Sequence, residues 1–291
     1  MSRYTTLIVE QVADHVALVT MNRLASANAL NTAMGLDLVD YFEGAAGQAR
    51  DIRCVVLTGA GDRAFCAGGD LKERNGMSDA AWRAQHLVFE RMARAILACP
   101  LPVIAAVNGA AFGGGCEIAA CCDFIYASSS ARFALTETSL GIIPGAGGTQ
   151  TIARSVGERR AKEIIFSAEP FDAATAAEWG LVNRVLPPEG LRAAAIERAQ
   201  RIAANAPLAV RAAKQAIGQG LQLPLADAMA VEIEIYNRLV PTNDRKEGVL
   251  AFNERRQPRF EDVELKCRHR AAGLAIARSR TEQPGNPMEH Q

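Results

Sequence analysis

The residues best suited to chemistry in this chain are a glutamate and the three glycines just before it. Gly113–Gly115 lead through a cysteine to Glu117, and they follow an apolar run, Val103–Val107, that predicts a buried strand. Glycines let the backbone approach a ligand closely, and a helix that begins here leaves the N–H groups of its first turn unpaired. A carboxylate beside such donors could polarise a carbonyl group and move a proton. The alternative is structural, because the helix dipole also favours an acid in a first turn.

A second glycine-rich loop follows another apolar strand. Cys54–Thr58 predicts a strand that is buried on both faces, and Gly59–Asp70 comes directly after it. A long amphipathic helix, 78–98, then follows with Ser78 as its N-cap. The order of strand, glycine loop and helix therefore occurs twice. Two parallel units of this kind could place both loops on one edge of a sheet, where ligands bind in α/β proteins.

A third glycine-rich stretch, Glu137–Gln150, holds a second candidate acid, Glu137. Its PGAGGT segment lacks the G-x-G-x-x-G spacing and the ribose-binding acid of a dinucleotide fingerprint, so NAD is not expected. Taken alone, Glu137 has the pattern of an acid in a surface loop. Its importance depends on whether the fold brings it to the other two loops.

The rest of the chain predicts alternating strands and helices, followed by helices only. Further strands are expected at 7–10, 16–21, 124–127, 132–135 and 181–185. Further helices are expected at 33–48, 161–167, 173–179, 191–205, 208–217, 225–240 and 246–255. The change to continuous helix after Pro207 predicts a subdomain boundary near residue 205.

The composition is that of an ordinary globular protein. The 291 residues are 49% hydrophobic and 22% charged, which suits one large domain or one domain with an appended subdomain. Lys+Arg and Asp+Glu both number 32, so the zero net charge indicates neither a nucleic-acid partner nor an acidic membrane surface. The N-terminal stretch has no signal-peptide pattern, and no segment approaches 18 uninterrupted apolar residues, so we expect a cytoplasmic protein without a membrane partner.

The cysteines and histidines do not form a recognisable metal or nucleophile motif. None of the 7 cysteines forms a C-x-x-C pair, and most lie in apolar or small-residue runs, which favours reduced and partly buried thiols. The 4 histidines are scattered, and no G-x-S-x-G sequence occurs. We therefore expect no metal. Cys66 and Cys116, which lie beside the glycine loops, are expected to be small packing residues.

Three motifs together resemble the crotonase, or enoyl-CoA hydratase/isomerase, family. They are Phe65–Arg74, Asn108–Asp123 and Glu137–Gln150, in the order and spacing of the family, and the similarity extends from about residue 7 to residue 260. The resemblance implies an α/β fold in which a spiral of repeated ββα units, 1–205, is followed by a helical C-terminal subdomain, 206–261, that mediates trimerisation. Residues 262–291 are expected to be a flexible tail. The resemblance also implies a homo-oligomer, either a trimer or a dimer of trimers.

The resemblance also assigns roles to the residues of the three motifs. Gly69 and Gly114 match the two glycines whose N–H groups form an oxyanion hole, and Glu117 and Glu137 match the two catalytic carboxylates. Possession of both glutamates is typical of the hydratases, which add water across the 2,3 double bond of a trans-2-enoyl-CoA thioester. Coenzyme A then arrives as part of the substrate, and no other cofactor is implied.

The same resemblance implies a set of contacts to the acyl-CoA. They are expected from Ala25, Ser26, Ala27, Ala67, Gly69, Asp70, Leu71, Lys72, Gly113 and Gly145. One departure from the family is that its usual N-R-P run with a following charged residue reads Asn22-Arg23-Leu24-Ala25, so no charge contact to CoA is expected from Ala25. Lys72 and Arg74 are expected to face solvent, with Arg74 the candidate for pairing a distal carboxylate in a glutaconyl-type substrate.

Within the family, longer segments of the sequence are most similar to the 3-methylglutaconyl-CoA hydratases. This interpretation depends on Asp70–Arg74, Ala161–Val182 and Pro241–Phe260, and it implies a role in the degradation of fatty acids or branched-chain amino acids. One alternative is another crotonase activity, an enoyl-CoA isomerase or a C–C lyase, against which the two glutamates argue. Another is RNA binding, which is less favoured because the predicted helix Met34–Gln48 carries three acids and no Lys or Arg and would repel a phosphate backbone.

Overall fold

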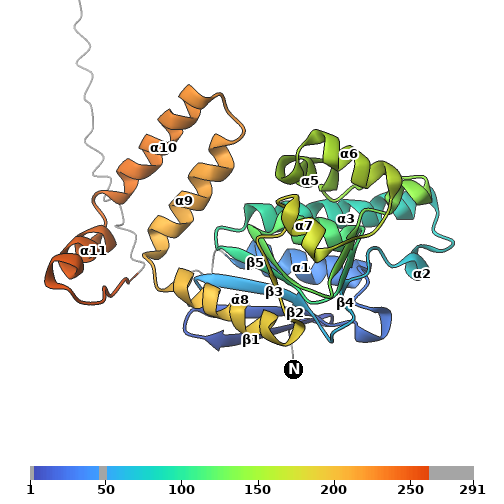
Figure 1. Ribbon diagram of the computed structural model, residues 1–291, viewed down its shortest axis with the longest axis horizontal. Helices are drawn as coiled ribbons and strands as arrows, with labels where there is room; N and C mark the ends of the chain where they lie inside the picture. Colours follow the sequence, from blue (N-terminus) through green and yellow to red (C-terminus); the bar gives the residue numbers. More distant parts are fainter. Residues whose placement is uncertain (1–2, 46–50, 262–291) are drawn as a thin grey trace, which may run out of the picture.

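The computed structural model describes residues 3–45 and 51–261, and its larger sheet runs through the centre of the molecule (Figure 1). The order of the six strands is β1-β2-β3-β5-β7-β10, with β1 antiparallel to β2 and the others parallel. Their bounds are β1 Leu7–Ala13, β2 Val16–Met21, β3 Cys54–Gly59, β5 Val103–Val107, β7 Phe124–Ser128 and β10 Arg184–Leu186. The last of these begins later than the predicted strand at 181–185.

A second, smaller sheet has the order β4-β6-β8-β9. Its strands are β4 Ala64–Cys66, β6 Ala110–Phe112, β8 Arg132–Ala134 and β9 Phe171–Asp172, and β4, β6 and β8 are parallel neighbours. The chain passes from β3 to β4, from β5 to β6 and from β7 to β8, so each turn contributes one strand to each sheet before a helical segment follows. This is the predicted spiral of ββα units.

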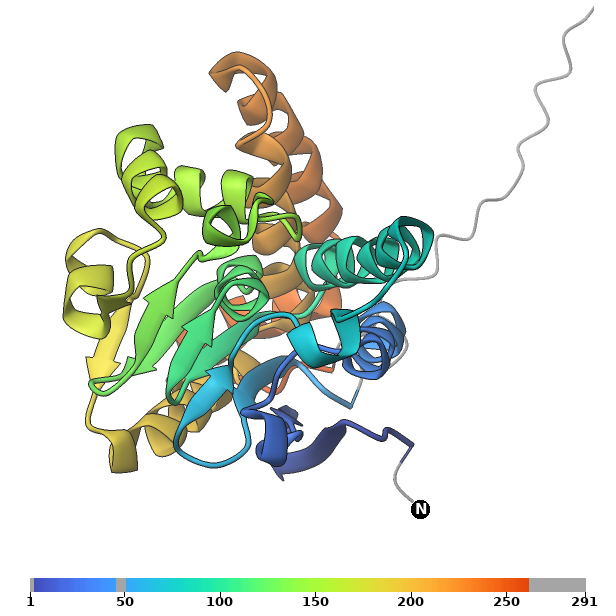
Figure 2. The ribbon, with the colours of Figure 1, turned by 90° about the vertical axis from the view of Figure 1, so that its right-hand side faces the viewer.

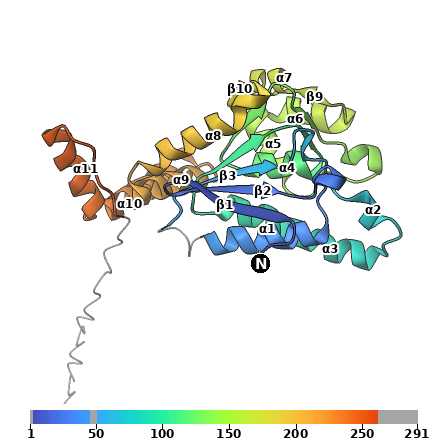
Figure 3. The ribbon, with the colours of Figure 1, turned by 90° about the horizontal axis from the view of Figure 1, so that it is seen from below.

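Helices cover both faces of the larger sheet, which explains why its strands are apolar without alternation. Ala17 and Val19 face the core that contains α1 (Thr32–Gly44) and α3 (Asp79–Ala98), whereas Val16 and Leu18 face α8 (Pro188–Ala203). Figure 2 shows α1 and α3 side by side, and Figure 3 shows α8 on the opposite side of the strands.

Side chains cap the N-termini of the two long helices, and Ser78 does so as the sequence predicts. The Asn31 side chain accepts a hydrogen bond from the Met34 N–H at 3.0 Å, and the Ser78 hydroxyl accepts one from the Ala81 N–H at 3.2 Å. The first helix extends from Thr32 to Gly44, and its predicted end at 48 lies outside the described residues.

The shorter helical segments lie mainly between the sheets and the surface. Their bounds are η1 Leu24–Ser26, α2 Leu71–Arg74, α4 Gly114–Cys121, η3 Glu137–Leu140, α5 Gly148–Val156, α6 Glu158–Ser167 and α7 Ala173–Glu178. None of the helices in the described ranges has both the length and the apolar character that a membrane span requires.

Three C-terminal helices extend away from the sheets as an arm (Figure 1). The arm consists of α9 Pro207–Gly220, α10 Leu225–Leu239 and α11 Asn243–Glu254. Lys214 on α9 ties it to the core through a 2.7 Å ion pair with Asp123. The subdomain boundary near residue 205 stays a prediction, and the predicted tail, 262–291, lies outside the described residues.

Candidate active site

Three of the four predicted catalytic residues follow three neighbouring strands of the smaller sheet. Gly69 comes after β4, Gly114 after β6 and Glu137 after β8. Because these strands are parallel, their carboxyl ends lie along one edge of the sheet. The sequence predicts that the glycine loops leave the long strands β3 and β5. In the structure, the short strands β4 and β6 intervene, and the loops leave from them.

The two glycine loops lie against each other. A β-carbon placed on Gly114 would be 3.9 Å from the amide nitrogen of Gly69. Leu30 pairs with the neighbours of Gly69, since its N–H donates to the Gly68 carbonyl at 2.8 Å and its carbonyl accepts from the Asp70 N–H at 2.9 Å. The Gly69 N–H takes no part in this pairing.

Gly114 presents the second backbone donor. It is the first residue of α4, where N–H groups have no acceptor within the helix. The preceding Gly113 has a φ of 48° and provides no side-chain cap. A β-carbon on Gly113 would also lie 2.9 Å from Oε1 of Glu137, so this position requires glycine for two reasons.

Glu117 lies one turn into α4 and is 3% exposed. Its Oε1 accepts hydrogen bonds from the N–H groups of Ala146 and Gly148, both at 2.8 Å. Burial raises the pKa of Glu117 to about 7, and the charge of Glu137 also raises it, whereas the two N–H donors oppose the increase. These donors favour the ionised form of a carboxyl group that burial alone would keep protonated.

Glu137 opens η3 and is 9% exposed. Burial also raises the pKa of this carboxyl group. Its Oε2 is buried and has no hydrogen-bond partner among the described residues, in contrast to the doubly bonded Oε1 of Glu117. A buried carboxylate oxygen without a donor is costly, so the environment of Glu137 favours the protonated form.

The first predicted CoA-binding segment lies beside the Gly69 loop. The Ala27 carbonyl accepts a hydrogen bond from the Ala67 N–H at 3.1 Å, which brings the turn formed by η1 to this loop. Ala25 and Ser26 are exposed on that turn, and Ala27 has a φ of 48°. The turn is therefore accessible from solvent next to the glycine donors.

The other CoA candidates differ in what their side chains do. Asp70 caps α2 by accepting from the N–H groups of Lys72 and Glu73, and it pairs with Arg23 at 2.9 Å, so its carboxylate is already occupied. Leu71 is 51% exposed, and Lys72 is exposed as predicted.

Arg74 was not placed correctly by the sequence, whereas the expected contact of Gly145 with the acyl-CoA stays a prediction. Arg74 does not face solvent, because it is half-buried and stacks on Trp82 with its guanidinium carbon 4.2 Å from the ring centroid. Gly145 lies against the imidazole of His86, whose Cε1 would be 2.4 Å from a β-carbon placed on this glycine. A histidine that the sequence leaves isolated thus supports the loop that contains Ala146.

The sequence also missed the backbone donors to Glu117. Ala146 and Gly148 belong to the PGAGGT segment, which reads only as an unsuccessful dinucleotide fingerprint. Its dense glycines were the available signal, because a β-carbon on Gly148 would lie 2.9 Å from Oε1 of Glu117.

The cysteines near the site are packing residues, as predicted. Cys66 and Cys116 are 0% and 1% exposed. Burial raises the pKa of Cys66 to about 11 and raises the pKa of Cys116 far above its ordinary value, so both thiols stay protonated. Within residues 3–45 and 51–261, no group of three His, Cys, Asp or Glu side chains is arranged to hold a metal ion.

Comparison with known proteins agrees with this arrangement. The model of the enoyl-CoA hydratase/isomerase family matches residues 11–264. The chain is 43% identical to a short-chain-enoyl-CoA hydratase of Clostridium acetobutylicum over 83% of this chain and 92% of that protein. It is 42% identical to a 2,3-dehydroadipyl-CoA hydratase of Escherichia coli over 85% and 96%. The crystal structure of an enoyl-CoA hydratase from Bacillus anthracis superposes with a TM-score of 0.87 at 43% identity, covering 88% of this chain and 99% of that one.

Proposed function

This chain belongs to the enoyl-CoA hydratase/isomerase family and is an enzyme of the hydro-lyase class, and we propose that it adds water across the 2,3 double bond of a trans-2-enoyl-CoA thioester. The observation that carries this proposal is one site with two buried carboxyl groups and two adjacent backbone donors. The carboxyl groups belong to Glu117 and Glu137, and the donors are the N–H groups of Gly69 and Gly114.

The backbone donors account for the activation of the thioester. When hydroxide adds to C3, negative charge develops on the thioester oxygen. The N–H groups of Gly69 and Gly114 would meet this charge without reorganisation, and each donor is worth roughly 3 kcal/mol of transition-state stabilisation. Both positions are glycine, so the substrate can approach the backbone itself.

The two glutamates account for the proton transfers. Glu117, whose Oε1 already accepts two N–H bonds, would remove a proton from the water that attacks C3. Glu137, whose Oε2 has no donor in the described part of the chain, would start protonated and deliver its proton to C2. The reaction needs no metal or redox cofactor, because coenzyme A enters as part of the substrate.

The pH dependence of the reaction tests this assignment of base and acid. With Glu117 as the base and a pKa of about 7, kcat/KM is expected to fall as the pH decreases through 7, approaching about tenfold per pH unit in the acid limb. The measurement is a pH profile of crotonyl-CoA hydration between pH 5 and 9. If the activity does not fall toward low pH, the reaction requires no ionised glutamate, which would contradict Glu117 as the base.

We propose a short or branched acyl chain of the 3-methylglutaconyl type as the substrate. Two relatives named above support a short or carboxylate-bearing chain, since one is named for short-chain enoyl groups and the other for 2,3-dehydroadipyl. Hydration of crotonyl-CoA and of 3-methylglutaconyl-CoA, followed by the loss of enone absorbance, tests the proposal. A preference for crotonyl-CoA would contradict the methylglutaconyl assignment, and inactivity toward both would contradict the hydratase. A cytoplasmic location is part of the same proposal.

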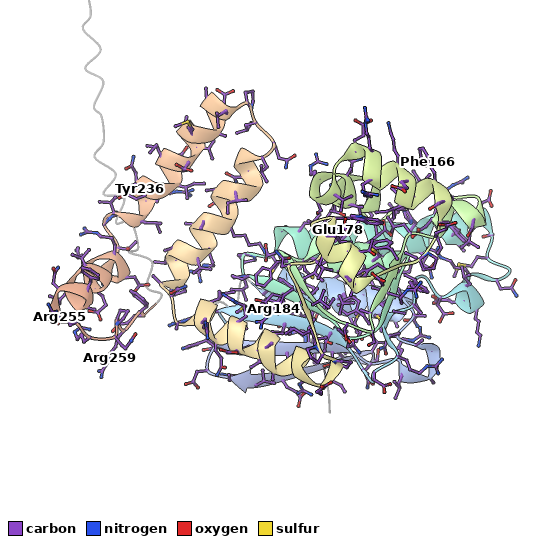
Figure 4. All side chains as sticks on the ribbon, in the orientation of Figure 1. Phe166, Glu178, Arg184, Tyr236, Arg255 and Arg259 are labelled. Carbon is purple, nitrogen blue, oxygen red and sulfur yellow. The ribbon has the colours of Figure 1, made fainter. Side chains whose placement is uncertain are left out.

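We also propose a homo-oligomer, a trimer or a dimer of trimers, held together through the C-terminal arm. α10 packs on α9 (Figure 1). The two helices and the turn between them nevertheless expose large apolar side chains. These are Ile217, Leu221, Leu225, Met229, Ile233 and Tyr236, of which Tyr236 is labelled in Figure 4. Exposed apolar side chains that gather on one pair of helices support an interaction surface.

Charges on this surface are expected to dissociate the oligomer. The double variant Met229→Asp, Tyr236→Asp places two carboxylates on side chains that are 58% and 62% exposed, so it should fold and yet lose the assembly. Light scattering after size exclusion should give about three or six times 31.1 kDa for the wild type and 31.1 kDa for the variant. A wild type that elutes as a monomer would contradict the proposal.

A further inference from the structure

The guanidinium group of Arg74 is held in one orientation beside the site. Its Nε donates a 2.8 Å hydrogen bond to Oε1 of Gln85, and its plane lies over Trp82, with Phe89 5.3 Å away on the same helix. The hydrogen bond at Nε and the ring of Trp82 together fix the orientation of the guanidinium plane. The two Nη groups are then the part of the side chain that can donate to a ligand.

The partner of Arg74 is itself fixed. Gln85 is 4% exposed, and its Nε2 donates to Oγ1 of Thr32 at 2.9 Å and to Oε2 of Glu73 at 2.7 Å. The same Glu73 oxygen accepts the Thr32 N–H at 3.0 Å. Because the amide nitrogen is committed to these two acceptors, the Gln85 oxygen must face Arg74. An arginine that only faces solvent needs no buried hydrogen-bond network to orient it. The network therefore indicates that the orientation of this guanidinium matters.

The guanidinium group of Arg74 lies beside the Gly69 loop. A β-carbon placed on Gly69 would lie 3.4 Å from Nη1. The charges of Glu117 and Glu137 act on the pKa of Arg74, yet neither forms an ion pair with it in the described part of the chain. Arg74 is thus close to the two glutamates, while its Nη groups have no carboxylate partner among residues 3–45 and 51–261.

We infer that Arg74 is a specificity-determining residue that binds a carboxylate at the far end of the acyl chain. This inference rests on the proposed function, since it places the thioester oxygen at the Gly69 N–H. A guanidinium presents paired N–H donors that match a carboxylate, and such charged bonds are strong where water is partly excluded. The substrate class is therefore the CoA monothioester of a short unsaturated dicarboxylic acid, in which the carboxylate is only a few carbons from the thioester.

A matched pair of substrates tests this inference. In trans-2-pentenoyl-CoA and trans-glutaconyl-CoA, the five-carbon chains differ only in that the terminal methyl group is replaced by a carboxylate. For Arg74→Met, the ratio of kcat/KM for glutaconyl-CoA to that for pentenoyl-CoA is expected to fall about 100-fold, as loss of a charge-assisted pair implies. Arg74→Lys should recover part of the ratio, because it restores the charge without the fork.

Two further variants distinguish a direct contact between Arg74 and the substrate carboxylate from a general effect of removing a positive charge. Arg83→Met removes a positive charge from the exposed surface of α3, the helix that carries Trp82 and Gln85, and should leave the ratio within about twofold. Gln85→Leu removes the positioning bond and should lower the ratio in the same direction as Arg74→Met. An unchanged ratio in Arg74→Met, or equal losses on both substrates, would overturn the inference. Failure of the wild type to hydrate either thioester would instead overturn the proposed function.

Discussion

Replacing Glu117 or Glu137 by glutamine is expected to lower kcat for crotonyl-CoA hydration by about 10²–10⁴-fold in each case. Glutamine keeps the volume of the side chain and can still accept the Ala146 and Gly148 N–H bonds at position 117. What it cannot do is take a proton from water or give one to C2. The loss should therefore appear in kcat, whereas the thermal stability and the KM change little.

The double variant distinguishes a cooperating pair from two independent groups. If the glutamates act on one water and one substrate, the combined loss should be much smaller than the product of the single losses. Glu158→Gln, a change of the same kind on the exposed surface of α6, is the control and should retain wild-type activity. A Glu137→Gln enzyme that keeps its rate within tenfold would contradict the mechanism and leave Glu117 as the single acid–base group.

The second large effect concerns the stability of the fold. Gly115→Ala is expected to destabilise the protein by about 3 kcal/mol or more, because a β-carbon there would lie 2.1 Å from the Cys66 carbonyl oxygen and 2.8 Å from the carbonyl carbon. The obstacle is the backbone of β4, which a rotamer change cannot relieve. α4 would have to move away from β4, and Gly114 and Glu117 would move with it.

Thermal or urea denaturation measures this effect, with an alanine at an open glycine for comparison. Gly218 in α9 has no atom within 4 Å of the built β-carbon, so Gly218→Ala should be neutral or should stabilise the helix by about 0.5–1 kcal/mol. Equal stability of the two variants would show that α4 and β4 are not packed as closely as the structure has them.

The long elements could be predicted from the sequence because their signals are local. β3 and β5 are continuous apolar runs, and α3 follows Ser78, whose side chain caps the helix as expected. β8 was predicted at 132–135, one residue longer than the observed strand, whereas β4 and β6 have three residues each and lie within glycine-rich segments, so no periodicity could reveal them.

The site itself is predictable only in part, because it assembles from three separate turns of the spiral. Glu117 and Glu137 were identified through the family motifs, but their different surroundings depend on which loop donates to which oxygen. Arg74 was expected to face solvent because an arginine at the end of a charged run usually does. Its half-buried position is produced by Trp82 and Gln85 on a different helix, and a linear pattern does not contain that contact.

The most direct test of the central claim is the identity of the product. Purified protein is incubated with crotonyl-CoA in ¹⁸O-labelled water, and the acyl-CoA is analysed by mass spectrometry. We predict a 3-hydroxyacyl-CoA that carries one labelled oxygen at C3 and one solvent hydrogen at C2. Recovery of an isomer of unchanged mass or of a cleaved acyl chain would contradict the assignment of Glu117 and Glu137 to the addition of water, and so would the recovery of both crotonyl-CoA and 3-methylglutaconyl-CoA unchanged.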